Sequence, residues 1–147
     1  MSASQPSMVD DVPVREVWER LKADPKAILI DVRTRSEWAF VGLPDLSSLN
    51  RRPVLVEWLG FPDNRINAEF VTELVDQLKG LGVDPKTDLY FLCRSGGRSR
   101  QAAQAMAGAG FERCHNVAEG FEGPLDPQRH RGTHSGWKAE GLPWAQG

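Results

Sequence analysis

The hydrophobic positions along the chain fall into two alternating patterns. Over 14–21 the apolar residues recur at helical spacing, and Pro25 ends the predicted helix because proline disfavours helical geometry in the residue before it. The run 27–32 is short, continuous and apolar. Such a run is typical of a strand that is covered on both faces of a parallel sheet.

The same alternation continues toward the C-terminus. Further strands are expected at 53–58, 88–92 and 113–117, and further helices at 67–78, 99–109 and 137–140. Strands that alternate with helices at this spacing predict an α/β domain with a mainly parallel sheet. The polar residues 1–12 predict a flexible N-terminal lead, which leaves 13–147 as a single domain.

Composition narrows the possible partners. The chain has 147 residues with 18 basic and 20 acidic side chains, a net charge of −2, so we expect no nucleic-acid or membrane partner. No apolar run approaches the ~20 residues that span a bilayer, and the first residues lack the apolar core of a secretory signal. Two cysteines make no disulfide framework. We expect a cytoplasmic protein that is a monomer or a weak homodimer.

One loop carries most of the chemistry. It follows the predicted strand 88–92 and precedes the predicted helix, and it consists of Cys93, Arg94, Ser95, Gly96, Gly97, Arg98 and Ser99. Ligands of open α/β sheets bind beyond the carboxyl ends of the strands, where this loop lies. The two glycines allow the backbone N–H groups to form an anion-binding nest, and the following helix directs its positive dipole end to the same place.

These features favour the thiolate form of Cys93. The guanidinium groups of Arg94 and Arg98 add positive charge, and their geometry suits oxyanions. The alternative is a buried structural cysteine followed by a solvent-facing turn. Two glycines and two arginines within five residues favour the reactive cysteine.

The sequence resembles the rhodanese superfamily over residues 13–144. The resemblance rests on residues 30–33 with 37–38, the loop 93–99, residues 116–117 with 119–121, and residues 136–138 with 141–143. It implies a three-layer α/β domain with helices on both faces of the sheet. The chain departs from the family where 42–45 replaces the usual Gly-His-Ile segment, which concerns the pocket rim and the acceptor.

The resemblance also implies an activity, thiosulfate sulfurtransfer, with no cofactor and no metal. Cys93 would attack the outer sulfur of a small anionic donor such as thiosulfate, release sulfite and carry the sulfur as a persulfide. The acceptor would be cyanide in assays and a thiol or a protein in cells. The backbone of 94–99 would cradle the persulfide, while Arg94 and Arg98 would orient the oxyanion end of the donor.

Several residues outside the loop have more than one interpretation. Asp31 and Arg33 point to the same face of their strand. One of them either touches substrate or fixes the active loop, or the two form a structural ion pair or loop anchor. Cys114 is either a core residue or a resolving thiol for Cys93. A zinc site is also conceivable from Cys114 and the three histidines His115, His130 and His134, but glycine and proline surround the last two, so we expect none.

Two other functions compete with sulfur transfer. Related phosphatases and arsenate reductases place five residues between the cysteine and the arginine, whereas four separate Cys93 from Arg98. The shorter loop makes a nest that suits a sulfur atom better than a tetrahedral phosphate. A catalytically silent interaction module is the second alternative, although such proteins typically lack the cysteine.

Overall fold

Five parallel strands form the central sheet of the protein. The computed structural model describes residues 9–60, 63 and 65–146. The strand order is β1-β6-β5-β2-β4, and each neighbouring pair is parallel. The strands are β1 (Asp10–Pro13), β2 (Ile28–Asp31), β4 (Val54–Leu55), β5 (Leu89–Leu92) and β6 (Cys114–Ala118). The predicted α/β fold with a parallel sheet is confirmed.

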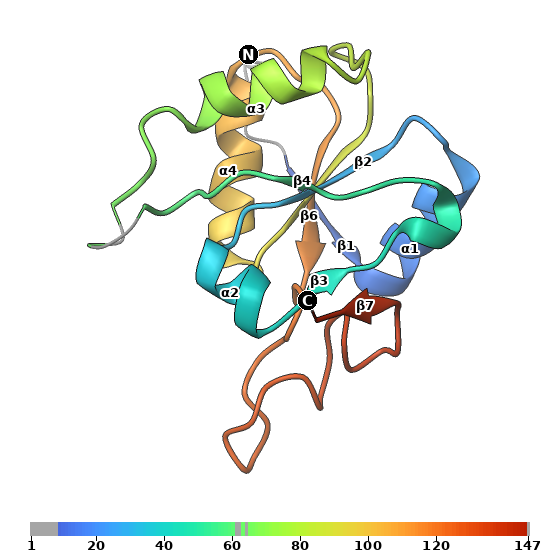
Figure 1. The fold of residues 1–147 in the computed structure, drawn as a ribbon, viewed down its shortest axis with the longest axis vertical. Coiled ribbons are helices and arrows are strands. Elements are labelled where there is room, and N and C mark those ends of the chain that lie inside the picture. The colour runs from blue at the N-terminus through green and yellow to red at the C-terminus, as the bar shows by residue number, and fades with distance from the viewer. Residues whose placement is uncertain (1–8, 61–62, 64, 147) are drawn as a thin grey trace.

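Helices cover both faces of this sheet. They are α1 (Val14–Ala23), α2 (Arg35–Phe40), α3 (Phe70–Lys79) and α4 (Gly97–Gly108), with a 3₁₀ turn η1 (Ser47–Leu49) before β4. Helices α3 and α4 lie on one side of the sheet and α1 on the other (Figure 1). The three-layer arrangement implied by the resemblance is therefore present.

The continuous apolar strands follow from these layers. Side chains alternate along a strand, so Ile30 and Phe91 pack toward α3 and α4, while Leu29 and Tyr90 pack toward α1. All four side chains are buried. Both faces of β2 and β5 must therefore be apolar, which is the pattern that identified them in the sequence.

A small antiparallel sheet ties the C-terminal segment to the carboxyl edge of the main sheet. It pairs β3 (Leu43–Pro44) with β7 (Trp144–Ala145). Gly42 precedes β3 at φ +114°, and a Cβ there would lie 2.8 Å from the Ala145 carbonyl oxygen. Position 42 must therefore be glycine, because β7 packs directly against it. Gly42 begins the segment 42–45, which stands where the resembled family usually has Gly-His-Ile.

Three predictions of local structure need correction. Of the predicted flexible lead, 1–8 lies outside the described residues, but 10–12 belongs to β1, which pairs with β6 and buries Val12. Only one apolar residue marks this strand in the sequence. The strand expected over 53–58 is confined to β4, and 137–140 forms turns rather than a helix because Gly136 and Gly141 adopt positive φ on either side. Within the described part of the chain, no helix is long and apolar enough to cross a membrane.

Candidate active site

Cys93 lies directly after β5, at the carboxyl edge of the sheet. The residue is 1% exposed, and its Sγ lies 3.1 Å from the backbone N of Gly96 and 3.2 Å from Ser99 Oγ. Gly96 makes the turn at φ +112°, and α4 begins at Gly97. The sulfur therefore lies at the N-terminus of a 12-residue helix, whose dipole favours negative charge there.

Arg98 is held by a carboxylate of the same chain. Its two terminal nitrogens donate to Glu37 Oε1 at 2.8 Å and Oε2 at 3.0 Å. Glu37 also closes a capping box with Thr34 at the start of α2. Burial alone would raise the pKa of Glu37, but Arg98 and Thr34 outweigh it and hold that pKa at about 2. The Arg98 fork is thus bound to α2, away from the oxyanion role expected of it.

The remaining loop residues face solvent or support the turn. Arg94, Ser95 and Gly97 are exposed, so Arg94 keeps a guanidinium free to meet an anion. The backbone behind them is fixed, because the Arg94 carbonyl accepts from the N–H groups of Glu122 and Gly123 at 3.0 and 3.1 Å.

A second turn supports the Cys93 loop from below. The Cys93 carbonyl accepts from the N–H of Phe121 at 2.8 Å. Gly120 precedes this contact at φ +65°, and a Cβ there would lie 2.5 Å from the Cys93 carbonyl oxygen. The two loops can approach this closely only because position 120 is glycine.

Asp31 and Arg33 form a buried ion pair. Both side chains are fully buried, with Arg33 Nη2 donating to Asp31 Oδ2 at 2.7 Å and to the Gly42 carbonyl at 2.8 Å. The guanidinium also lies 4.2 Å from the ring centroid of Phe121. This geometry supports the structural interpretation: the pair joins β2 to β3 and to the segment under the Cys93 loop.

Asn116 and Asp11 complete the site, although the sequence had indicated no role for either. Asn116, in β6, is 3% exposed and accepts from Ser99 Oγ at 2.5 Å. Its Nδ2 donates to Asp11 Oδ1 at 2.9 Å and to the Gly96 carbonyl at 3.1 Å. The signal that the sequence offers for Asn116 is an asparagine inside the predicted strand 113–117.

Cys114 lies at the opposite edge of the sheet from Cys93. In the register of β5 and β6 it is opposite Leu89, four residues before Cys93, which is roughly 13 Å along the strand. A disulfide needs Cα atoms within about 7 Å, so Cys114 cannot resolve Cys93 in this fold. Burial raises the pKa of Cys114 to about 12. The cysteine is therefore a core residue.

The histidines are also dispersed. The His115 ring lies between two carboxylates, Asp10 Oδ1 at 2.6 Å and Asp88 Oδ1 at 2.8 Å, and stacks on Tyr90. His130 and His134 are exposed and lie between β6 and β7. Among the residues that the structure describes, no group of three or more His, Cys, Asp or Glu side chains could hold a metal.

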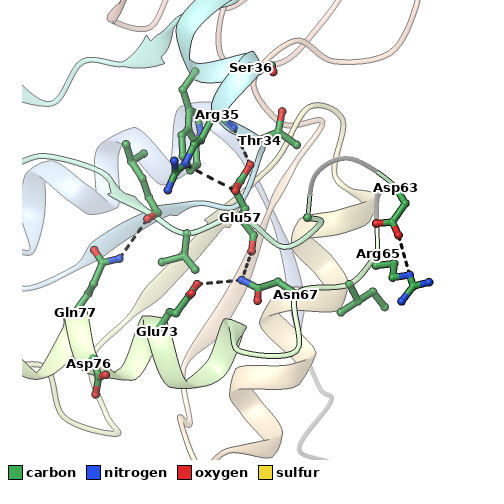
Figure 2. A pocket seen from close by; sticks show the side chains of 15 residues that line it. Thr34, Arg35, Ser36, Glu57, Asp63, Arg65, Asn67, Glu73, Asp76 and Gln77 are labelled. Atoms are coloured by element: carbon green, nitrogen blue, oxygen red, sulfur yellow. Dashed lines mark hydrogen bonds and ion pairs between the residues drawn. The ribbon is translucent and has the colours of Figure 1, made fainter.

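A large hollow lies beside the site, between α2, β4 and α3. Its volume is about 1140 Å³, and the residues of the Cys93 loop are not among those that line it (Figure 2). Four carboxylates and two guanidinium groups line it, from Glu57, Asp63, Glu73, Asp76, Arg35 and Arg65. This excess of negative charge is unsuited to an anionic donor, whereas the Gly96 N–H, the start of α4 and Arg94 give the surroundings of Cys93 the opposite polarity.

Comparison with known proteins assigns the chain to a family. A three-layer α/β fold with a cysteine between a central strand and the N-terminus of the next helix defines a rhodanese-like protein. The chain belongs to the family described as the STR4 middle domain, which matches residues 10–147.

The chain is also similar to individual proteins of known sequence or structure. The crystal structure of Rv0390 from M. tuberculosis is 46% identical, covers 95% of this chain and 98% of its own, and superposes with a TM-score of 0.85. The rhodanese-like domain-containing protein 4 of Arabidopsis thaliana chloroplasts is 27% identical over 133 residues, which are 90% of this chain and 25% of that protein. The polysulfide-sulfur transferase homodimer of Wolinella succinogenes shares the fold at a TM-score of 0.58 and 21% identity, over 99% of this chain and 83% of its own.

Proposed function

We propose that the protein is a sulfurtransferase that carries sulfane sulfur as a persulfide on Cys93. The observation that carries this proposal is the Cys93 sulfur at the start of α4, 3.1 Å from the N–H of Gly96. An N–H donor and a helix dipole stabilise negative charge on sulfur, both as an attacking thiolate and as a persulfide anion. A transfer cycle passes through both of these anions.

The cycle consists of two displacements on sulfur. In the first, the Cys93 thiolate attacks the outer sulfur of thiosulfate, the bond between the two donor sulfurs breaks, and sulfite leaves with the electron pair. In the second, an acceptor nucleophile attacks the outer sulfur of the persulfide, and the Cys93 thiolate leaves. Neither step needs an external oxidant or reductant, because one bond to the sulfane sulfur forms as another breaks and the leaving group keeps the electron pair.

Arg94 is the arginine that we assign to the donor. Arg98 is bound to Glu37 through both terminal nitrogens, whereas Arg94 is exposed at the rim of the loop. Arg98 then contributes through the position of α4, since its charge is paired with Glu37. This division of roles also disfavours the phosphatase alternative, in which the arginine after the cysteine must bind the phosphate directly.

The physiological donor and acceptor are proposals of the same kind. A small cationic nest suits thiosulfate, and the acceptor in cells is a thiol or a protein. Both cysteines are free thiols, which suits the reducing cytoplasm that we propose as the compartment.

Formation of thiocyanate from thiosulfate and cyanide tests the proposal. We expect turnover in the wild type and in Cys114→Ser, and none in Cys93→Ser. Equal rates in Cys93→Ser and the wild type would contradict it. Inactivity of the wild type toward thiosulfate and toward other sulfane donors would favour a phosphatase or a silent interaction module instead.

A further inference from the structure

Three buried side chains form a hydrogen-bonded row behind the reactive sulfur. Cys93, Ser99 and Asn116 are 1%, 0% and 3% exposed. Ser99 Oγ lies 3.2 Å from Cys93 Sγ and 2.5 Å from Asn116 Oδ1. Ser99 thus lies between the sulfur and the amide, within reach of both.

The orientation of the Asn116 amide is set by its other partners. Its Nδ2 faces the Asp11 carboxylate at 2.9 Å and the Gly96 carbonyl at 3.1 Å, which are both acceptors. The reversed amide would direct an oxygen at two acceptors, which is unfavourable. Asn116 therefore presents its oxygen, which can only accept, to Ser99.

Strand β1 maintains this orientation. Asp11 is opposite Asn116 in the parallel pairing of β1 with β6, and its carboxylate also pairs with Arg100 of α4. The partner that fixes the amide thus comes from an edge strand, 105 residues earlier in the chain.

Ser99 has one hydroxyl proton for two neighbours. If it donates to Asn116, its lone pairs face Cys93 and can accept from an S–H group, so a thiol is fully satisfied. If it turns to a Cys93 thiolate, the buried Asn116 oxygen loses its donor, which is costly. Asn116 and the thiolate therefore compete for one proton.

We infer that Asn116 is a positioning residue that acts on Cys93 through Ser99. By binding the Ser99 proton it leaves the resting thiolate with the Gly96 N–H as its donor and keeps Cys93 closer to the thiol form. The inference rests on Cys93 being the reactive thiol of the proposed function. It assigns to Asn116 control over how readily that thiol ionises.

The test is a pH titration of the ultraviolet absorbance of the thiolate, without any sulfur donor. Every protein in the titration carries Cys114→Ser. The signal of the Cys93→Ser variant in this same background is subtracted, so that the difference reports Cys93 alone. We expect Ser99→Ala to move the midpoint by less than about 0.3 pH unit, because Ser99 already donates elsewhere. We expect Asn116→Leu to lower the midpoint by about one pH unit, because the freed hydroxyl then donates to the thiolate.

The double variant with Ser99→Ala and Asn116→Leu distinguishes an effect of Asn116 through Ser99 from a general loosening of the Cys93 loop. If Asn116 acts through Ser99, Asn116→Leu has no further effect in the Ser99→Ala background. Other charges near Cys93 belong to Arg94, the Arg98–Glu37 pair, the Asp31–Arg33 pair and the Asp11–Arg100 pair. Asn116→Leu removes the amide donor of Asp11, and an effect of that loss on Cys93 would not need Ser99 and would persist in the double variant. Thermal unfolding identifies any variant that fails to fold, with Asn116→Ala as the smaller substitute.

Three results would overturn the inference. The first is a rise of about one pH unit in Ser99→Ala, which would mean that Ser99 already donates to the sulfur. The second is an unchanged midpoint in a folded Asn116 variant. The third is a shift that persists in the double variant. Because no donor is present, a protein that fails to transfer sulfur still gives a decisive titration.

Discussion

At the scale of single residues, the Glu37–Arg98 pair determines where the arginine of the loop points. Both side chains are mostly buried, at 18% and 20% exposed, and the contact is bidentate. The sequence identified Arg98 as cationic but gave no reason to choose Glu37 among 20 acidic residues as its partner. The pairing depends on the contact of α2 with the start of α4, which no local pattern reports.

Replacement of Glu37 tests the contribution of this pair to stability. The pKa of Glu37 lies at about 2 in the fold against an ordinary 4.5, so its stabilisation is complete above about pH 4.5 and is lost as the pH falls toward 2. We expect Glu37→Gln to lower the free energy of unfolding by about 2 kcal/mol at pH 7. The difference from the wild type should shrink below pH 4.5.

Urea denaturation over a range of pH measures this effect. Glu16→Gln is the matched control, because Glu16 pairs with Arg20 on an exposed helix surface and should contribute less than about 0.5 kcal/mol. Equal losses in the two variants, or a Glu37 effect that is constant down to pH 3, would contradict the role of the buried pair.

At the scale of elements, the sequence pattern predicted the helices and strands that contribute several apolar residues to the core. It missed the elements that are short or mostly polar. β2, β5, α1, α3 and α4 were predicted because each contributes several apolar residues to the core. β1 was missed because Val12 is its one deeply buried side chain and two aspartates precede it. α2 was missed because none of its six residues is buried, although Thr34 and Glu37 have the spacing of a capping box, which is a helix-start signal in the sequence.

The turn after β6 lies so close to the Cys93 loop that it leaves no room for a side chain at position 120. Gly120 approaches the carbonyl oxygens of Cys93 and Arg94, where a Cβ would lie 2.5 and 2.6 Å away. We expect Gly120→Ala to cost more than about 2 kcal/mol of stability and to displace the Cys93 loop, with loss of sulfur transfer.

Gly141→Ala is the control for backbone strain. Gly141 also has a positive φ, +75°, but its added Cβ would meet nothing within 4 Å. It should cost about 1 kcal/mol and leave transfer intact. Denaturation and the thiocyanate assay compare the two variants. Similar losses of stability and activity in both would show that the positive φ, rather than the contact of position 120 with the Cys93 loop, causes the loss.

At the scale of the whole molecule, the sheet separates the two cysteines. Cys93 follows the carboxyl end of β5 and Cys114 begins β6 at the amino edge, a separation that strand register fixes and the sequence does not report. The sequence therefore left a resolving role for Cys114 open. Burial raises its pKa to about 12, so the thiolate that would be required is suppressed as well.

Labelling distinguishes the two thiols in the native protein. We expect iodoacetamide at pH 8 to leave Cys114 unmodified in the folded chain and to modify both cysteines after unfolding. Oxidation with diamide should give no intramolecular disulfide. Modification of Cys114 in the folded protein, or a Cys93–Cys114 disulfide, would contradict this placement.

The central claim is that Cys93 carries sulfur, and the mass of the intact protein tests it most directly. The reduced protein is incubated with thiosulfate, freed of excess donor and weighed beside its Cys93→Ser and Cys114→Ser variants. The account predicts a gain of one sulfur, about 32 Da, in the wild type and in Cys114→Ser, with sulfite released in step and no gain in Cys93→Ser. A gain in Cys93→Ser, or its absence from the wild type with every sulfane donor, would contradict it.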